Sequence, residues 1–252
     1  MENRTSERTS ILKALLGDAN ASINSYLDVG CGDGSISLEV SNALAIPNSY
    51  LTDVVQPNKT MEGFFLTDPS NIHFPLEDGS IDLITCFVSI HHFTDPNAMF
   101  SEIMRVLKVG GYLFIREHDV EPSDSDTATY LDVMHHLFPD PYYPCFFRSK
   151  ATLRRSFSKS MSMIGYHDYP EPYNPQHLYH ELWVRLRGRD SAIELDKNDY
   201  VRPLDLVPWV KSHVKEVTKL ATKTGTKRQY SDIARFIPKI KSINELYSFL
   251  HE

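Results

Sequence analysis

The segment LDVGCGDGSISLEV, from Leu27 to Val40, places three glycines within five positions between an apolar run and an amphipathic run. Glycine costs about 0.5 to 1 kcal/mol relative to alanine in regular structure, so such a cluster suits a tight turn or a close approach to a ligand. A strand, a glycine-rich turn and a helix in this order offer free helix N-terminal amides to a ligand. The segment predicts a ligand-binding βα turn at Gly30, Gly32 and Gly34.

The third glycine comes one residue too early for the full dinucleotide fingerprint, so a turn that merely connects strand and helix stays open for this segment alone. Through residue 187, short apolar runs alternate with helical patterns, which is typical of a parallel sheet with helices on both faces. Strands are expected at 25–29, 49–53, 81–88, 112–117, 161–166 and 177–187, and helices at 9–17, 35–44 and 97–107, the last leading into a turn at 109–111.

Three acidic residues fit a nucleoside site near this turn. Asp53 ends the second expected strand, 19 residues beyond Gly34, where doubly wound sheets place an acid that accepts hydrogen bonds from a ribose. Asp68 lies in a loop suited to an adenine amino group. Asp28 lies inside the first apolar run, where a buried carboxylate needs donors. We expect the amides of the glycine turn to supply them.

The motifs together resemble the class I S-adenosylmethionine-dependent methyltransferases, in particular the subgroup called methyltransferase type 11. The resemblance covers residues 26–187 and rests on YLDVGCGDGS, Asp53, FPLEDGSIDLITC, SIHHF and MRVLKVGGYLFIREHD in this order. It implies a doubly wound, seven-stranded, mostly parallel Rossmann-like sheet whose last strand, YHELWVRLR, is antiparallel. The segment FPLEDGSID is two residues longer than the commonest form of its motif, so Asp53 matches the family pattern more closely than the loop around Asp68 does.

The resemblance also implies S-adenosyl-L-methionine as the cofactor, with no metal. The residues expected to bind it are Asp28, Gly30, Cys31, Gly32, Gly34, Asp53, Asp68 and Ser89.

The acceptor is expected at the carboxyl ends of the strands, beside the cofactor. Polar clusters follow two of these strands and the next helix: Ser89, His91 and His92; Glu117, His118 and Asp119; His135 and His136. A positioned histidine or carboxylate there can take the acceptor's proton. We select His92, Glu117 and His118 as catalytic candidates, with Tyr142 or Tyr143 shaping a lid. A strand-end histidine that is simply a satisfied loop group is the alternative for each.

The acceptor's chemical class stays open between oxygen and nitrogen nucleophiles. The chain has Arg116, Glu117 and His118 where a cap ribose methyltransferase would need a lysine, and SIHH where a base-nitrogen enzyme would carry Asp/Asn-Pro-Pro-Tyr. Small molecules, guanine-N7 of an mRNA cap, other RNA and protein side chains remain as acceptors. A methyltransferase fold without catalysis, which contacts RNA or a protein, is the second class of function.

We divide the chain into a methyltransferase domain, 1–187, and a helical basic extension, 188–252. Between Lys211 and Lys241, seven Lys and two Arg face two acidic residues, although the whole chain has a net charge of −7. Pro208 is expected to open a helix that Gly225 ends, followed by a turn led by Ser231 and a last helix that begins with a Ser242–Glu245 capping box.

On that first helix an apolar stripe is expected at Val210, Val214, Val217 and Ala221. The other side carries Lys211, Lys215, Lys219 and Lys223. Such a face is either simply solvated or a site for a polyanion such as RNA.

Three cysteines, Cys31, Cys86 and Cys145, are widely spaced and odd in number, which predicts free thiols. No apolar run approaches the roughly 20 residues of a membrane span, and MENRTSERTS lacks the apolar core of a signal peptide. We therefore expect a cytoplasmic protein.

Overall fold

The computed structural model describes residues 2–138, 142–170, 177–184 and 192–252. These residues form two compact units, each discontinuous in the sequence. The first comprises Met1–Asp119 and Ser149–Asp199, and the second comprises Val120–Arg148 and Tyr200–Glu252. The second unit therefore takes in a segment that the sequence interpretation assigned to the methyltransferase domain.

The first unit contains a sheet whose described strands lie in the order β3-β2-β1-β4-β5-β7-β6. The neighbouring strands β3, β2, β1, β4 and β5 run parallel to one another. Strand β7 is antiparallel to both of its neighbours, β5 and β6. The strands span β1 (Ser25–Val29), β2 (Asn48–Asp53), β3 (Phe64–Leu66), β4 (Ile81–Phe87), β5 (Leu107–Asp119), β6 (Ser162–Pro170) and β7 (His177–Val184). The predicted Rossmann-like arrangement is confirmed, including an antiparallel β7.

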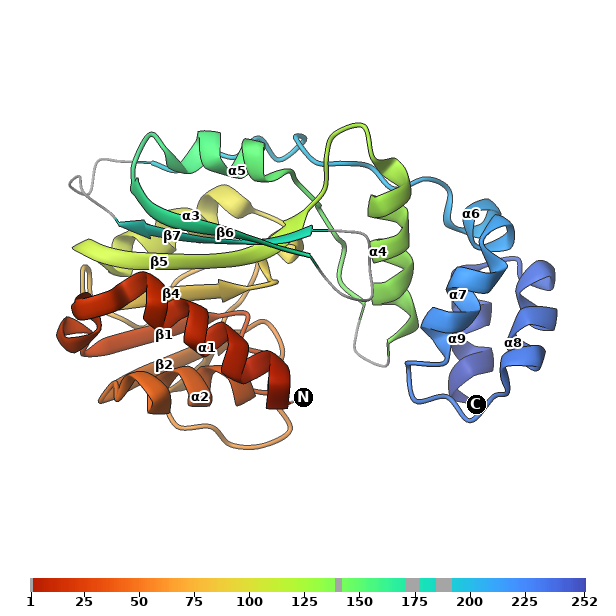
Figure 1. Cartoon of the computed structure of the whole chain (residues 1–252), viewed down its shortest axis with the longest axis horizontal. Helices are drawn as coiled ribbons and strands as arrows, with labels where there is room; N and C mark the ends of the chain where they lie inside the picture. The colour runs from red at the N-terminus through yellow and green to blue at the C-terminus, as the bar shows by residue number, and fades with distance from the viewer. Residues whose placement is uncertain (1, 139–141, 171–176, 185–191) are drawn as a thin grey trace. The chain divides into compact units, whose positions relative to one another are not determined.

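Helices cover both faces of this sheet (Figure 1). The first unit contains α1 (Glu2–Leu16), η1 (Gly17–Ser22), α2 (Ser35–Leu44), η2 (Ile90–His92), α3 (Pro96–Val106) and α5 (Lys150–Phe157). Side chains that alternate along a strand reach opposite faces. Tyr26 therefore packs with α1 and α2, whereas Leu27 packs with α3 and α5.

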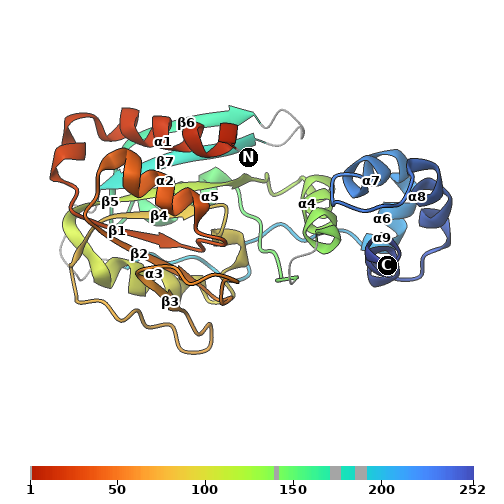
Figure 2. The same ribbon diagram turned by 90° about the horizontal axis from the view of Figure 1, so that it is seen from below.

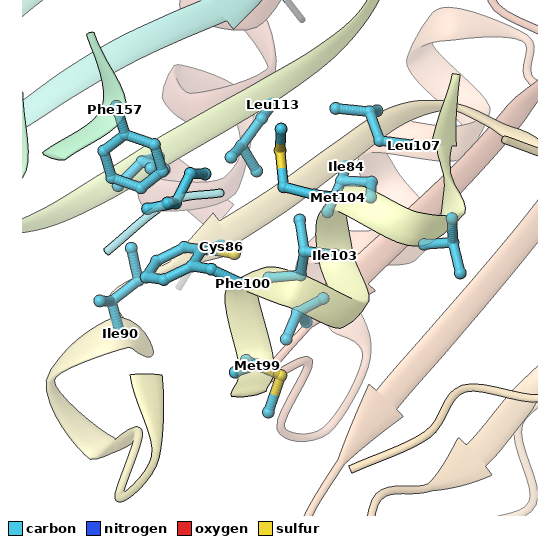
Figure 3. Close-up of a cluster of buried hydrophobic side chains, with 14 of the residues drawn as sticks. Ile84, Cys86, Ile90, Met99, Phe100, Ile103, Met104, Leu107, Leu113 and Phe157 are labelled. Carbon is cyan, nitrogen blue, oxygen red and sulfur yellow. The ribbon is translucent and has the colours of Figure 1, made fainter. Parts of the chain in front are cut away.

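The core beneath α3 is continuous from the helix to the central strands (Figure 3). Phe100 and Ile103 of α3 pack with Ile84 of β4 and Leu113 of β5, and Phe157 of α5 meets Phe100 edge to face at 5.0 Å. The helix begins at Pro96 because the Asp95 side chain accepts a hydrogen bond from the Ala98 amide at 3.0 Å. This packing holds the ends of β4 and β5 in place.

One expected feature of the first unit is wrong, and two elements were not expected. The turn expected at 109–111 belongs to β5, which begins at Leu107 with an irregular register against β4. Gly110 accommodates this bulge with φ 82°. The short strand β3 and the helix α5 were not expected. The last three residues of the strand expected at 177–187 lie outside the described residues.

The second unit is helical (Figure 2). Its helices are α4 (Ser125–Leu137), α6 (Leu206–Ser212), α7 (Val214–Ala221), α8 (Tyr230–Phe236), η3 (Ile237–Lys239) and α9 (Ile243–His251). Val133 and Leu137 of α4 are buried in one cluster with residues of α6 to α9. This apolar face is the reason why α4 belongs to the same compact unit as the C-terminal helices.

The expected basic helix is divided in two. Val210, Val217 and Ala221 are buried and Val214 is half-buried, as the stripe predicts, but His213 leaves the helical region with φ −113° and separates α6 from α7. The turn expected at Ser231 is the first turn of α8 instead. None of the helices in the described ranges combines the length and apolar character that crossing a lipid bilayer requires.

Candidate functional site

The glycine turn joins β1 to α2 with three glycines at positive φ: 81° at Gly30, 55° at Gly32 and 72° at Gly34. A Cβ atom at Gly30 would overlap the Cβ of Ser89, so this glycine is required by the protein's own packing. Among the described residues, a Cβ at Gly32 would meet no heavy atom within 4 Å. The turn is therefore closed on one side and open at Gly32, where a ligand can approach the backbone.

Asp53, the last residue of β2, lies against this open part of the turn. Its carboxylate accepts hydrogen bonds from the Gly32 amide at 2.8 Å and from the Val55 amide at 3.1 Å. A carboxylate offers about four acceptor positions, so two amide donors leave it capacity to accept from a bound ligand. Its partly exposed position after β2 fits the sequence expectation of a ribose-binding acid.

Asp28 lies in β1, before the glycine turn, and its side chain is buried between β1, β4 and α2. Its carboxyl oxygens accept hydrogen bonds from the hydroxyls of Ser37, at 2.5 Å, and Thr85, at 2.7 Å. The expected donors, the amides of the glycine turn, are not among these partners, because the side chain points toward the face that α2 covers. Burial raises the pKa of Asp28 to about 6. Asp28 supports the turn from the protein interior.

The other expected cofactor residues differ in exposure. Ser89 is buried and donates its hydroxyl to the Val29 carbonyl oxygen at 2.9 Å, which ties the ends of β1 and β4 together. Cys31 is buried in the turn, and burial raises the pKa of its thiol. Asp68 is exposed in the loop after β3 and accepts from the amide and hydroxyl of Ser70, which hold its pKa below the usual value.

A buried carboxylate and two histidines meet at the carboxyl ends of β4 and β5. Glu117 Oε1 lies 2.7 Å from His91 Nδ1 and 2.7 Å from the His118 amide nitrogen, and Oε2 lies 3.2 Å from the His91 amide nitrogen. The donor atoms of His91, Glu117 and His118 lie within 4.8 Å of one another. Such a set can hold a proton, or a divalent ion of the type that imidazole and carboxylate ligands select.

His92 forms the more exposed part of this cluster. Its ring centroid lies 4.1 Å from that of His91, and the His91 ring lies 5.2 Å from that of His118. Glu117 is 2% exposed, and desolvation raises its pKa, while positive charge on His118 and His92 acts in the opposite direction. The expected catalytic residues His92, Glu117 and His118 are thus brought together, with His91 as a direct partner of Glu117.

Val88 precedes this cluster in an unusual backbone conformation. Its φ is 55°, in the left-handed region that β-branched residues avoid, and its amide donates to the Arg116 carbonyl oxygen at 2.6 Å. Residues under such strain gather at functional sites. Sequence alone gives no signal for it, because valine at the end of a strand reads as ordinary core.

The remaining candidates belong to the second unit. His135 Nδ1 and His136 Nδ1 lie 2.7 Å and 2.9 Å from the carbonyl oxygens of Leu131 and Asp132, one turn earlier on α4. Tyr142 stacks on the His136 ring at 3.7 Å. Tyr143 is half-buried. His135 and His136 thus each contact a carbonyl oxygen of their own helix, and Tyr142 contacts that helix through the His136 ring.

Comparison with known proteins shows what part of the first unit is similar to. Residues 27–115 match the family model described as a methyltransferase domain. The chain is 29% identical to the thiol S-methyltransferase TMT1B of Rattus norvegicus over 149 residues, which are 53% of this chain and 58% of that protein. It is 29% identical to the human protein of the same name over 140 residues, 50% of this chain and 54% of that one. The chain therefore spans less than two thirds of these curated relatives.

Solved structures show the same fold. A geranyl diphosphate methyltransferase in complex with GPP and sinefungin superposes with a TM-score of 0.55 at 14% identity, over 71% of this chain and 78% of that one. The family model covers the glycine turn, Asp53 and most of the two strands β4 and β5, so residues 27–115 are similar to the domain of class I S-adenosylmethionine-dependent methyltransferases, and the solved structure shares their fold.

Proposed function

We propose that this protein transfers the methyl group of S-adenosylmethionine to a small molecule whose nucleophilic atom, sulfur, oxygen or nitrogen, first loses a proton. The observation that carries the proposal is the buried cluster of Glu117 with His91 and His118, on strands next to the glycine turn. A thiol is the first acceptor class to test, since the curated relatives are thiol S-methyltransferases.

The cofactor's place in this proposal is at the switch point between β1 and β4, where the strand order reverses. Gly32 offers open backbone and Asp53 retains acceptor capacity for ribose hydroxyls. Gly30, Gly34, Asp28, Ser89 and Cys31 shape the turn, and Asp68 lies two residues beyond β3.

When bound, the cofactor supplies a methyl carbon activated by a sulfonium leaving group. The residues of the chain then have two tasks, orientation and proton removal. The glycine turn and Asp53 orient the nucleoside, and the strand-end histidines accept the proton that the acceptor loses. Burial of Glu117 excludes water from this proton path.

RNA acceptors form a second candidate. The observation in its favour is a set of four exposed lysines on and next to α6 and α7, namely Lys211, Lys215, Lys219 and Lys223. These cations would hold a polyanion that the acidic remainder of the chain repels. A member of the fold without catalysis, which uses this face to bind RNA or a protein, is the corresponding non-enzymatic alternative.

The experiment is transfer of labelled methyl from S-adenosylmethionine to parallel panels of thiols, phenols, amines and capped or uncapped RNA. We expect turnover on small thiols or phenols, with at least tenfold loss in Asp53→Ala through weaker cofactor binding. Calorimetry of the cofactor with wild type and Asp53→Ala separates binding from catalysis. Cofactor binding without turnover on any panel would instead favour the binding module, and turnover on RNA alone would favour the second candidate.

A further inference from the structure

Three side chains that can bind a metal meet at the carboxyl ends of β4 and β5. His91, Glu117 and His118 each offer one ligand atom, and these atoms lie within 4.8 Å of one another. The shortest separation given by their contacts is 2.7 Å, between His91 Nδ1 and Glu117 Oε1. Tetrahedral ligands at the usual zinc bond lengths lie about 3.3 Å apart. The separations in the cluster bracket this value, so small side-chain rotations suffice to reach coordination distance.

The main chain holds the carboxylate of Glu117 between the two histidines. Its Oε2 accepts a hydrogen bond from the His91 amide at 3.2 Å, and its Oε1 accepts one from the His118 amide at 2.7 Å. Both donors thus belong to the residues that offer the other two ligand atoms. Hydrogen bonds of this kind orient the carboxylates that bind metals in proteins. The three residues are therefore fixed relative to one another before any ion arrives.

The backbone that leads to His91 is strained. Val88 has φ 55°, and its amide donates to the Arg116 carbonyl oxygen at 2.6 Å. The chain turns here from the end of β4 into η2, which places His91 against Glu117 of β5. A β-branched residue avoids this conformation, and such strain is typical of sites that clamp a ligand. The strain is independent of the ligand distances and also favours a binding site.

Burial and donor chemistry indicate which ligand this site would take. The side chains of His91 and Glu117 are 1% and 3% exposed, and His118 is buried as well. A buried carboxylate costs free energy unless a cation or a proton neutralises it. Imidazole nitrogens suit zinc and other late first-row dications, whereas magnesium and calcium take oxygen ligands. Two imidazoles and one carboxylate therefore point to zinc.

We propose that His91, Glu117 and His118 form a binding site for a zinc ion, which joins η2 to the end of β5. The ion takes the place of the hydrogen between His91 Nδ1 and Glu117 Oε1, and one proton passes to water as the ion binds. His92 is half-buried and is not one of the three ligands, so it remains for removal of the acceptor's proton. The family resemblance, which implies no metal, did not lead us to expect this site.

The first test is zinc binding by the full chain after a chelator has removed bound metal. Titration with zinc chloride against a chromophoric chelator should show one equivalent with a submicromolar dissociation constant, and magnesium should not compete. Glu117→Gln and His118→Asn should each weaken zinc binding at least a hundredfold. His73→Asn is the matched control, because His73 Nδ1 lies 3.2 Å from Glu102 Oε1 in a histidine–glutamate pair outside the proposed site. This variant should keep the wild-type affinity for zinc.

A second measurement uses wild type alone and so does not depend on the folding of a variant. The X-ray absorption fine structure of the zinc-loaded chain should show nitrogen and oxygen neighbours, with the multiple scattering of two imidazole rings. The melting temperature should rise with zinc concentration, because an ion that binds the native state stabilises it.

The metal site would be overturned by wild type that binds no zinc, or by wild-type affinity in a folded Glu117→Gln. Equal loss of affinity in His73→Asn would contradict it too, as would sulfur neighbours in the absorption spectrum, which would place the ion on a cysteine. None of these measurements needs turnover. A chain that binds zinc at this site but methylates no acceptor would contradict the proposed function and leave the metal site established.

Discussion

At the scale of single residues, Asp28 is a carboxyl group whose ionisation works against folding. Its side chain accepts hydrogen bonds from the hydroxyls of Ser37 and Thr85, and desolvation raises its pKa from 3.8 to about 6. A raised carboxyl pKa means that the native state holds its proton more tightly than the unfolded state. The stability that Asp28 contributes is therefore complete below pH 4 and decreases as pH rises through 6.

Replacement of Asp28 by Asn removes this titration. We expect wild type to lose about 2 kcal/mol from this group between pH 4 and pH 6.5, and Asp28→Asn to show a correspondingly flatter dependence of the free energy of unfolding on pH. Urea unfolding across this range measures it. Asp18→Asn is the control, since Asp18 is exposed and should keep the wild-type slope. A variant with the wild-type slope would mean that Asp28 titrates normally.

Two glycines of the same turn should respond differently to alanine. Both have positive φ, which costs an alanine about 1 kcal/mol. Gly30→Ala also forces a collision with Ser89, so we expect a further loss of stability, about 2 to 4 kcal/mol in total. Gly32→Ala meets open space and should cost about 1 kcal/mol.

The affinity for S-adenosylmethionine separates the two roles. Calorimetry should show at least tenfold weaker binding in Gly32→Ala, whose new methyl group occupies the open side of the turn. Wild-type affinity in that variant would show that the ligand does not approach Gly32. Urea unfolding of both variants measures their stability, so that a loss of affinity can be distinguished from a loss of folded protein.

The site residues that could be predicted from the sequence are those whose role follows from their position relative to a strand. Gly30, Gly32 and Asp53 follow strands at fixed spacing, and the structure brings them together. The partners of Asp28 could not be predicted, because Thr85 reaches it across the β1–β4 pairing. The choice of His91 as the partner of Glu117 likewise depends on how β4 and β5 align.

At the scale of elements, helix α2 ends in a conformation that its sequence does not favour. Ala45 is exposed and has φ 55°, and the amides of Ala45 and Ile46 bond back to the carbonyls of Asn42 and Ser41. This pattern is a Schellman-type cap, in which glycine is the preferred residue. Alanine pays for the left-handed conformation, whereas glycine adopts it freely.

Ala45→Gly should therefore stabilise the protein by about 1 kcal/mol. Ala43→Gly is the matched control: it makes the same chemical change inside α2 and should destabilise by a similar amount. Thermal unfolding of both variants measures the difference. Destabilisation by Ala45→Gly would show that the cap is not left-handed in solution.

Helices and strands with a clear sequence pattern of their own were predicted closely. The errors occur where contacts between distant parts of the chain decide the structure. The helix 35–44 and the strand 25–29 match the structure residue for residue. Ser242 caps α9 as expected, but Glu245 reaches back to the Lys241 amide instead of the Ser242 amide. The break at His213 was hidden, because the apolar stripe continues across it and His213 stacks on Trp209 at 4.1 Å.

At the scale of the whole chain, the two compact units differ in secondary structure and in content. The first contains the sheet and the candidate site, and the second contains the basic helices. The expected boundary at 187 followed the end of the family pattern. The sequence did not show that 120–148 belongs to the second unit. The apolar face of α4 packs on helices that begin about 70 residues later in the chain.

The four lysines of the second unit provide a test of its role. All are exposed, while the stripe between them is buried or half-buried, so replacing Lys211, Lys215, Lys219 and Lys223 with Glu should change stability by less than about 1 kcal/mol. We expect wild type to bind single-stranded RNA at low salt and to release it as salt rises, by about 0.7 log units of affinity per log unit of salt for each lysine that contacts phosphate.

The quadruple Glu variant should lose this binding and its salt dependence. A matched variant carries four exposed lysines of the first unit changed to Glu, namely Lys13, Lys59, Lys159 and Lys197. Because both variants change the net charge equally, a general charge effect would weaken both alike, whereas a site on the second unit would weaken only the first variant. Fluorescence anisotropy with labelled RNA at several salt concentrations measures this. Equal binding by all three proteins would mean that the lysine face is only solvated, and RNA would then be removed from the candidate acceptors.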